Sequence, residues 1–173
     1  YRALMLGLKN YMTKNGFRFA HLGLSGGIDS ALTLAILADT IESENIHSFY
    51  LPSKFSSNDS KKDAESLSKN VGIKTSEISI EILRNNILKH LDPIFKKYKE
   101  DVTEENIQSR LRGLILMALS NKLDSLLVTT GNKSELAVGY STLYGDMCGG
   151  YSLLKDVYKT DVFELCRWRN KNI

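Results

Sequence analysis

The six residues from Ser25 to Ser30 read Ser-Gly-Gly-Ile-Asp-Ser and combine the parts of an anion-binding turn with a carboxylate. The two glycines let backbone N–H groups face inward, the two serines supply hydroxyl groups, and a helix beginning here adds positive potential. Asp29 would be repelled by phosphate unless a cation intervenes, so the pattern predicts that it holds Mg²⁺ against phosphate oxygens. The alternative is that Asp29 only caps the helix.

Two common phosphate-binding motifs are excluded. A Walker A loop requires Gly-Lys followed by Ser or Thr, and no Gly-Lys dipeptide occurs in the chain. The dinucleotide fingerprint Gly-x-Gly-x-x-Gly also fails, since the order from Gly23 is Gly-Leu-Ser-Gly-Gly. A phosphate site at this turn must therefore be of another kind.

The turn lies in a chain whose apolar pattern alternates between strand-like and helix-like segments. Strands are predicted at residues 17–25, 45–53, 74–80 and 124–132. Helices are predicted at residues 28–38 and 58–71, in a stretch ending near Leu91, and in a long segment capped by Thr103. This alternation predicts an α/β fold, a parallel sheet with helices on both faces.

Polar residues follow three of the predicted strands, at residues 25–30, 51–56 and 129–135. Ligands of such folds bind at the carboxyl ends of the strands, so these three loops are expected to converge on one edge of the sheet.

The long helix carries an apolar stripe and a polar stripe. Its predicted core face consists of Ile107, Leu111, Leu114, Ile115 and Ala118. The neighbouring stripe, at 4-3-4 spacing, holds Asn106, Arg110, Gly113 and Met117. It offers a ligand two polar side chains beside a glycine. Arg112 is predicted to point elsewhere as an ordinary solvated side chain, which is also the alternative for Arg110.

Composition indicates an ordinary globular protein. The chain has 173 residues, 42% hydrophobic and 25% charged, which predicts one domain. A net charge of +3 suits an anionic small molecule and gives little reason to expect a nucleic acid. Two cysteines without a CxxC pair favour a reducing, cytoplasmic compartment, and the apolar runs at 31–38 and 114–119 are too short for a membrane span. Because the chain starts at Tyr1, we expect it to be part of a longer protein.

The string SGGIDS, directly after a predicted strand, resembles the signature of the N-type ATP pyrophosphatases. The resemblance implies a Rossmann-like fold of the adenine nucleotide alpha hydrolase type. It also implies that the loop holds the β- and γ-phosphates of ATP, which leave together as pyrophosphate while a substrate oxygen attacks the α-phosphorus.

Later segments are similar to NAD synthetase, in particular the synthetase domain of the glutamine-dependent branch. They are residues 105–122, 129–150 and 153–170, supported by residues 1–17 and 51–57. The resemblance implies that Mg-ATP adenylylates the nicotinate carboxylate of deamido-NAD and that ammonia then displaces AMP. It further implies a homodimer or higher homo-oligomer, and an amino-terminal glutaminase domain and further carboxyl-terminal residues that this chain lacks.

Site residues carry over by position in this sequence. The implied ATP contacts are Gly23, Leu24, Ser25, Gly26, Gly27, Ile28, Asp29, Ser30, Thr130 and Lys159. The implied deamido-NAD contacts are Asn106, Arg110, Glu135, Tyr140, Ser141, Thr142 and Leu143. Asp29 and Lys159 are the implied catalytic residues, and Asp29 and Glu135 the implied magnesium ligands.

Several alternatives remain open at this point. Glu135 could be an exposed loop carboxylate, and Lys133, Lys155 and Lys159 ordinary surface lysines. A GMP synthetase or an asparagine synthetase would share SGGIDS but lack the segment at 129–150, and a tRNA thiolation enzyme should show a cysteine pair. A non-catalytic nucleotide-binding module would bind ATP without cleaving it.

Overall fold

A five-stranded parallel sheet organises the chain, and the computed structural model describes all residues from 1 to 173. Its strands are β1 (Phe19–Gly23), β2 (Ile46–Tyr50), β3 (Thr75–Glu77), β4 (Ser125–Thr129) and β5 (Tyr151–Ser152). Their order is β3-β2-β1-β4-β5, with Ala20 opposite both Ile46 and Leu126. The chain therefore reverses its direction of travel across the sheet between β1 and β4, where α/β folds bind ligands.

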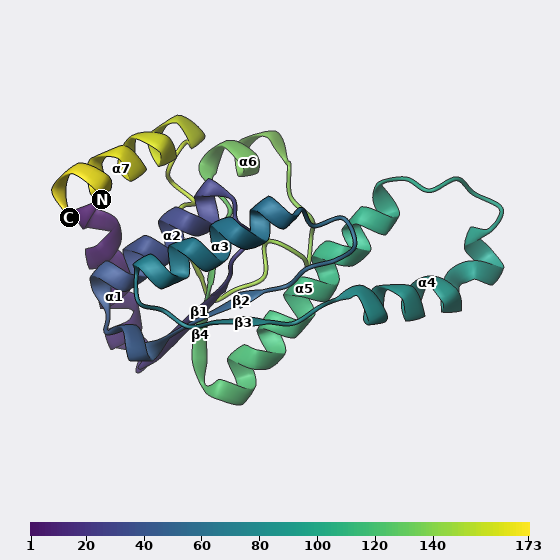
Figure 1. The fold of residues 1–173 in the computed structure, drawn as a ribbon, viewed down its shortest axis with the longest axis horizontal. Coiled ribbons are helices and arrows are strands. Elements are labelled where there is room, and N and C mark those ends of the chain that lie inside the picture. Colours follow the sequence, from purple (N-terminus) through teal and green to yellow (C-terminus); the bar gives the residue numbers. More distant parts are fainter.

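The chain also forms seven α-helices, most of them packed around this sheet (Figure 1). They are α1 (Arg2–Asn15), α2 (Ile28–Thr40), α3 (Asn58–Asn70), α4 (Glu81–Phe95), α5 (Val102–Leu123), α6 (Lys133–Val138) and α7 (Lys159–Asn172). Helices α2 and α3 cover one face, α5 covers the other, and α1 and α7 pack against α2. The predicted fold class is confirmed.

The main core lies between the sheet and α2, with further contributions from α1 and α7. Seven residues of α2 are buried because this helix is apolar almost all round, as a helix covered by both a sheet and other helices must be. Leu8 and Met12 of α1 and Val162 of α7 complete this core. Under α5, a smaller cluster joins Phe49, Leu51 and Ile80 to half-buried residues of that helix.

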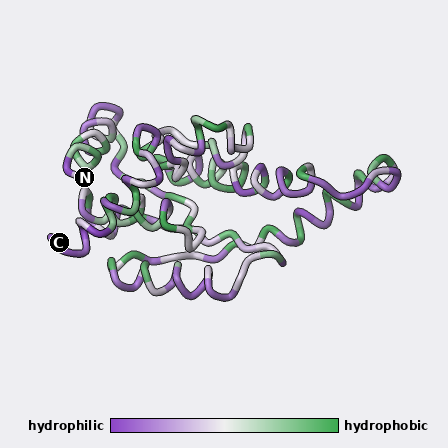
Figure 2. Tube along the Cα trace, turned by 90° about the horizontal axis from the view of Figure 1, so that it is seen from above, coloured by the Kyte–Doolittle hydropathy of each residue, from purple (hydrophilic) through white to green (hydrophobic).

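The arm formed by α4 and the first turns of α5 extends away from the sheet (Figures 1 and 2). Large apolar side chains on this arm stay exposed, among them Ile82, Ile94, Tyr98 and Val102. The arm therefore presents an unpartnered apolar surface beside the sheet edge that carries the polar loops.

Two predicted boundaries differ from the structure. The third strand is shorter than predicted, Thr75–Glu77, because the chain then turns into α4: Ile80 is the N-cap of α4 and already has a helical backbone conformation, and the helix continues past Leu91 to Phe95. The cap of α5 is Asp101, not Thr103: its carboxylate accepts a hydrogen bond of 2.8 Å from the Thr103 N–H, and Glu104 completes a capping box.

The predicted core face of α5 is wrong at Leu114, which is 65% exposed, and at Ala118, which is also exposed. The covered face is centred on Leu111 and Ile115 and continues through Leu119, whereas Leu114 lies beyond Leu111 on the opposite side. Three elements, α1, α6 and β5, lie in segments for which the sequence predicts no helix or strand.

Candidate nucleotide site

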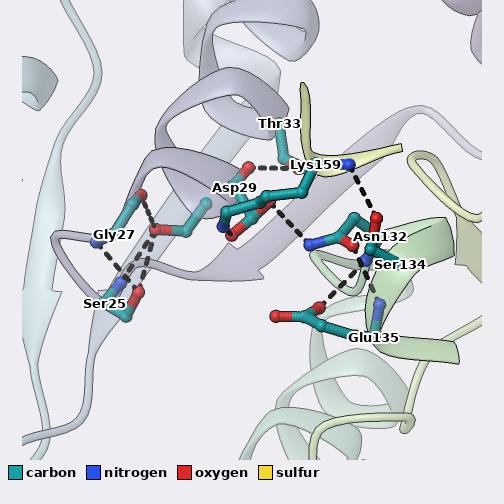
Figure 3. Close-up of polar contacts among 9 residues, drawn as sticks. Ser25, Gly27, Asp29, Thr33, Asn132, Ser134, Glu135 and Lys159 are labelled. Atoms are coloured by element: carbon teal, nitrogen blue, oxygen red, sulfur yellow. Dashed lines mark hydrogen bonds and ion pairs between the residues drawn. The ribbon is translucent and has the colours of Figure 1, made fainter. Parts of the chain in front are cut away.

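The turn between β1 and α2 is braced by the hydroxyl groups of its two serines (Figure 3). The Ser30 hydroxyl donates to the Gly27 carbonyl at 2.9 Å and accepts from the Ser25 N–H at 3.2 Å. The Gly27 N–H donates to the Ser25 hydroxyl at 3.1 Å. Ser30 is buried, so its hydroxyl group holds the shape of the turn.

Gly26 is the position in this turn at which no other residue type fits. Its φ of 83° lies in the left-handed region, and a Cβ at this position would collide with the backbone of Ser60 in α3. A glycine is therefore required here both by conformation and by the close approach of a neighbouring helix.

The Asp29 carboxylate, in the first turn of α2, receives two donors from distant parts of the chain (Figure 3). The ammonium group of Lys159, the first residue of α7, forms an ion pair with Oδ2. The side-chain amide of Asn132 donates to Oδ1 at 3.0 Å. The alternative that Asp29 only caps its helix is wrong, because the N-cap of α2 is Gly27 and no side chain caps this helix. The Asp29 carboxylate instead joins α2 to the starts of α6 and α7.

A capping box at the start of α6 places Glu135 beside this group. Asn132 is fully buried, its Oδ1 accepts from the Glu135 N–H at 3.1 Å, and its own N–H donates to Glu135 Oε2 at 3.1 Å. The Lys159 N–H donates to the Ser134 hydroxyl at 3.0 Å, which ties the start of α7 to the start of α6. Asp29 and Glu135, the two predicted magnesium ligands, therefore both form hydrogen bonds with Asn132.

A cavity of about 620 Å³ opens at the carboxyl ends of β1, β2 and β4. The predicted residues that line it are Gly23, Leu24, Ser25, Asn106, Thr130, Tyr140, Ser141 and Thr142. The others, Gly26, Gly27, Ile28, Asp29, Ser30, Arg110, Glu135, Leu143 and Lys159, are not among its lining residues. The three loops converge on one edge as expected, with the phosphate turn and the Asp29 cluster beside the cavity.

The structure corrects the prediction for Arg112. Its side chain is half-buried, lines the cavity, and donates from Nε to the Leu51 carbonyl at 3.0 Å. Burial lowers the pKa of the Arg112 guanidinium. Arg110 is exposed and donates from Nε to the Leu143 carbonyl at 3.2 Å. Of the two arginines, Arg112 is the one that faces the space for a ligand.

The loop after α6 is held against α5 by a second polar group. The Thr142 hydroxyl donates to Asn106 Oδ1 at 2.9 Å, and the Thr142 N–H donates to the Asp146 carboxylate at 3.0 Å. The Ser109 hydroxyl accepts from the Asp146 N–H at 3.0 Å. Tyr140 in this loop is 74% exposed. Asn106 and Thr142, predicted for the same ligand, therefore lie in contact.

Close packing of this loop depends on Gly113, whose position on α5 has no room for a Cβ because Gly145 and Cys148 approach it. Burial, together with the nearby Asp146 charge, raises the pKa of the Cys148 thiol, as suits a space-filling side chain.

Sequence reasoning missed Asn132, Ser109 and Asp146. A signal existed for Asn132, because Asn followed three residues later by Glu, directly after a strand, is typical of a capping box. The contact of Ser109 with Asp146 depends on how the loop folds back on α5 and leaves no comparable pattern.

These features define a class of protein: a parallel α/β domain with a lysine-free glycine- and serine-rich turn after its first strand and a cavity at the reversal of strand order. Residues 1–172 match the family described as NAD synthase, and the chain belongs to that family. Two curated relatives are the glutamine-dependent NAD(+) synthetases of Rhodobacter capsulatus and of Xanthomonas campestris pv. campestris (strain 8004), respectively 55% and 54% identical over 98% of this chain.

A solved structure agrees with this assignment. The glutamine-dependent NAD+ synthetase of Acinetobacter baumannii, in complex with adenosine diphosphate, superimposes with a TM-score of 0.95 at 48% identity and covers 97% of this chain. The chain spans 31% of the length of the two curated relatives and 32% of the A. baumannii chain.

Proposed function

We propose that this chain is the ATP-cleaving synthetase part of an enzyme that amidates deamido-NAD to NAD. A nicotinate carboxylate oxygen attacks the α-phosphorus of ATP, the bond to the β-phosphate oxygen breaks, and pyrophosphate leaves. Ammonia then attacks the carbonyl carbon of the mixed anhydride, AMP leaves with its electron pair, and the nitrogen loses a proton. The sequence similarity to glutamine-dependent synthetases favours this acceptor over that of a GMP or asparagine synthetase.

The observation that carries the proposal is the meeting of Lys159 with Asp29 at the amino-terminal end of α2, beside the phosphate turn. Charge that develops on departing pyrophosphate is stabilised by preorganised donors such as backbone N–H groups and a lysine ammonium. The turn supplies the N–H groups, and Lys159 supplies the positive charge that a Walker A lysine supplies elsewhere.

The Asp29 and Glu135 carboxylates are of the ligand type that Mg²⁺ prefers, although Asp29 Oδ2 is paired with Lys159 in this structure and the lysine would have to turn to a phosphate oxygen when the ion binds. Magnesium keeps several waters and binds through one or two carboxylates plus substrate phosphates, so it does not need a complete cage of protein ligands. No three His, Cys, Asp or Glu side chains gather closely enough to hold a metal by themselves. Asp29 would hold the ion with Glu135 nearby, and bound Mg²⁺ would neutralise phosphate charge.

The acceptor is assigned to the cavity between α5 and the loop at residues 139–146. Asn106 and Thr142 supply polar contacts there, and the Arg112 guanidinium adds a positive charge. Arg110, which donates to the Leu143 carbonyl, lies outside the cavity lining but on the same helix as Asn106. No general base is required, because a carboxylate is already a nucleophile and the mixed anhydride is strongly activated.

The remaining features of the proposal concern the setting of the enzyme. We propose a single domain within a longer cytoplasmic protein, whose nitrogen comes from glutamine, and a homodimer that covers the apolar surface of the α4–α5 arm. No nucleic acid or membrane partner is proposed. No helix of the structure combines the length and the apolar character needed to cross a membrane.

Pyrophosphate release with Mg-ATP and ammonium, measured against a panel of acceptors, tests this function. The panel contains deamido-NAD, its mononucleotide half, xanthosine monophosphate and aspartate. Release that depends on deamido-NAD supports the proposal, and release with another acceptor alone overturns the assignment. ATP binding without pyrophosphate release from any acceptor identifies a non-catalytic module. The Asp29→Asn variant should fold normally and lose its Mg-dependent activity, and retained activity would remove the metal assignment.

A further inference from the structure

Helices α2 and α7 run parallel and are joined by two ion pairs with the same spacing. Lys159 pairs with Asp29, and ten residues further along both helices Arg169 pairs with Asp39. At 1.5 Å of rise per residue, the two pairs lie about 15 Å apart along the helices. One pair is at the proposed nucleotide site, and the other lies at the far end, where the two chain termini come together (Figure 1).

The far pair, Asp39 with Arg169, is less exposed to solvent than the Asp29–Lys159 pair and is held by two hydrogen bonds from the arginine. The side chains of Arg169 and Asp39 are 21% and 12% exposed, whereas that of Lys159 is 39% exposed. Arg169 donates to Asp39 from both Nε and Nη2 at 2.8 Å. This bidentate geometry fixes direction as well as distance, which a single lysine contact does not.

A third donor completes the far pair. The Tyr1 hydroxyl donates to Asp39 Oδ2 at 2.6 Å, and its ring lies 5.3 Å from the ring of Trp168, the neighbour of Arg169. Burial and the hydrogen bond to Asp39 raise the pKa of Tyr1, and the hydrogen bond to Asp39 raises the pKa of Arg169, so both donors keep their protons.

Between the two pairs, α7 is held by ordinary packing. Val162 is fully buried, and Leu165 and Cys166 pack against the main core. Apolar contacts of this kind resist separation of the helices but tolerate a small slide along the axis, because they are not directional. The fork of Arg169 on Asp39 is therefore the directional contact that sets the axial position of α7 on α2 at the far end, while the hydrogen bond from the Lys159 N–H to Ser134 ties the start of α7 to α6.

We propose that Arg169 and Asp39 are positioning residues for Lys159: they fix α7 along α2 so that the Lys159 ammonium meets the phosphate turn. The inference rests on the proposed function, because Lys159 matters only if the turn binds nucleotide. The polar side-chain contacts of Asp39 are with Arg169 and Tyr1, at the end of α2 away from the phosphate turn, so an effect of this pair on the turn would be transmitted by the position of α7 and its first residue, Lys159.

A double-mutant cycle on the full chain tests the inference. The variants are Arg169→Met, Lys159→Met and the combination of both, and the readout is kcat and KM for ATP. A displacement of about 1 Å can cost about 100-fold in rate, so Arg169→Met is expected to lower kcat/KM for ATP between about 10- and 100-fold. In the Lys159→Met background the same change is expected to cost less than about 3-fold, because the group it positions is gone.

The controls separate positioning from general damage. Arg167 pairs with Glu164 on the exposed side of the same helix, and Arg167→Met is expected to leave kcat/KM unchanged. Arg169→Lys keeps the charge but loses the fork, and is expected to recover part of the activity. If Arg169→Met fails to fold, Asp39→Asn, which is nearly isosteric, replaces it in the cycle.

Equal losses in both Lys159 backgrounds would overturn the inference, since they would show that Arg169 acts on the fold and not through Lys159. If the unaltered chain releases no pyrophosphate with any acceptor, the proposed function fails. The Kd for ADP is then measured for the same three variants and the unaltered chain. Non-additive losses of ADP affinity then support the positioning role, and additive losses contradict it.

Discussion

The side-chain amide of Asn132 donates a hydrogen bond of 3.0 Å to the carboxylate of Asp29, 103 residues earlier in the chain. This bond crosses the reversal of strand order, because Asp29 follows β1 and Asn132 follows β4. It fixes the carboxylate on one side while Lys159 approaches it on the other. The two halves of the candidate nucleotide site are therefore joined by one buried amide.

The Asn132→Ala variant is expected to lose both stability and activity. It removes the cap of α6 and leaves buried partners unsatisfied, which costs about 1–3 kcal/mol in the free energy of unfolding. As a matched variant, Asn132→Asp keeps the cap but replaces the amide donor with a second carboxylate beside Asp29. Because position 132 is fully buried, the two neighbouring carboxylates should lower the thermal stability, measured by thermal denaturation, at least as much as Asn132→Ala does, and pyrophosphate release is lost in both variants. Full activity in Asn132→Asp would contradict the role given to the amide.

Removal of the Lys159 charge should weaken catalysis far more than removal of a neighbouring charge. Lys159→Met is expected to lower kcat/KM for ATP about 100-fold or more, as losing one preorganised electrostatic donor does. Lys155, an exposed lysine just before α7, is the matched control, and Lys155→Met should stay within about 2-fold of the unaltered chain. Steady-state kinetics at varied ATP concentration measure both, and similar losses in the two variants would count against Lys159.

Two glycines with similar backbone angles should respond differently to alanine. Gly16 has a φ of 74° and open space around it, so Gly16→Ala should cost only the conformational strain, about 1–2 kcal/mol. Gly26 has a φ of 83°, and its new Cβ would also meet the Ser60 backbone, so Gly26→Ala should destabilise more and abolish ADP binding. Denaturant titration and calorimetry measure these effects, and normal ADP binding by Gly26→Ala would refute the close-approach argument.

The Asp39–Arg169 pair predicts a pH dependence of stability. Burial alone would raise the pKa of Asp39, but the hydrogen bonds from Arg169 and Tyr1 outweigh it and the pKa is lowered. A carboxyl group with a depressed folded pKa contributes fully above its unfolded value of about 3.9 and loses that contribution as the pH falls through the folded pKa. The stability difference between the unaltered chain and Asp39→Asn should therefore be constant near neutral pH and shrink in acid. A difference that widens in acid would contradict this sign.

The sheet and its ligand-binding edge could be predicted because the responsible patterns are local. Strand and helix segments differ in apolar period, and the rule that ligands bind at strand ends then places three separate loops together. The sequence does not distinguish Asp101 from Thr103 as the cap of α5, because both residue types are good caps and only the backbone conformation separates them.

Contacts between distant segments could not be predicted in the same way. The spacing on α5 favoured Arg110 over Arg112, but the packing of α5 on the sheet turned Arg112 toward the cavity. The Asp39–Arg169 pair joins residues 130 positions apart, and no periodicity in either helix marks it. Such partners become visible only when the axial positions of the helices are known.

Transfer of labelled oxygen tests the central claim, adenylylation of a carboxylate, most directly. Deamido-NAD with ¹⁸O in its nicotinate carboxylate is incubated with Mg-ATP, ammonium and the full chain, and the products are analysed by mass spectrometry. The account predicts one ¹⁸O in each AMP and none in pyrophosphate, because the attacking carboxylate oxygen stays with the α-phosphorus when ammonia displaces AMP. Unlabelled AMP formed along with NAD would contradict it.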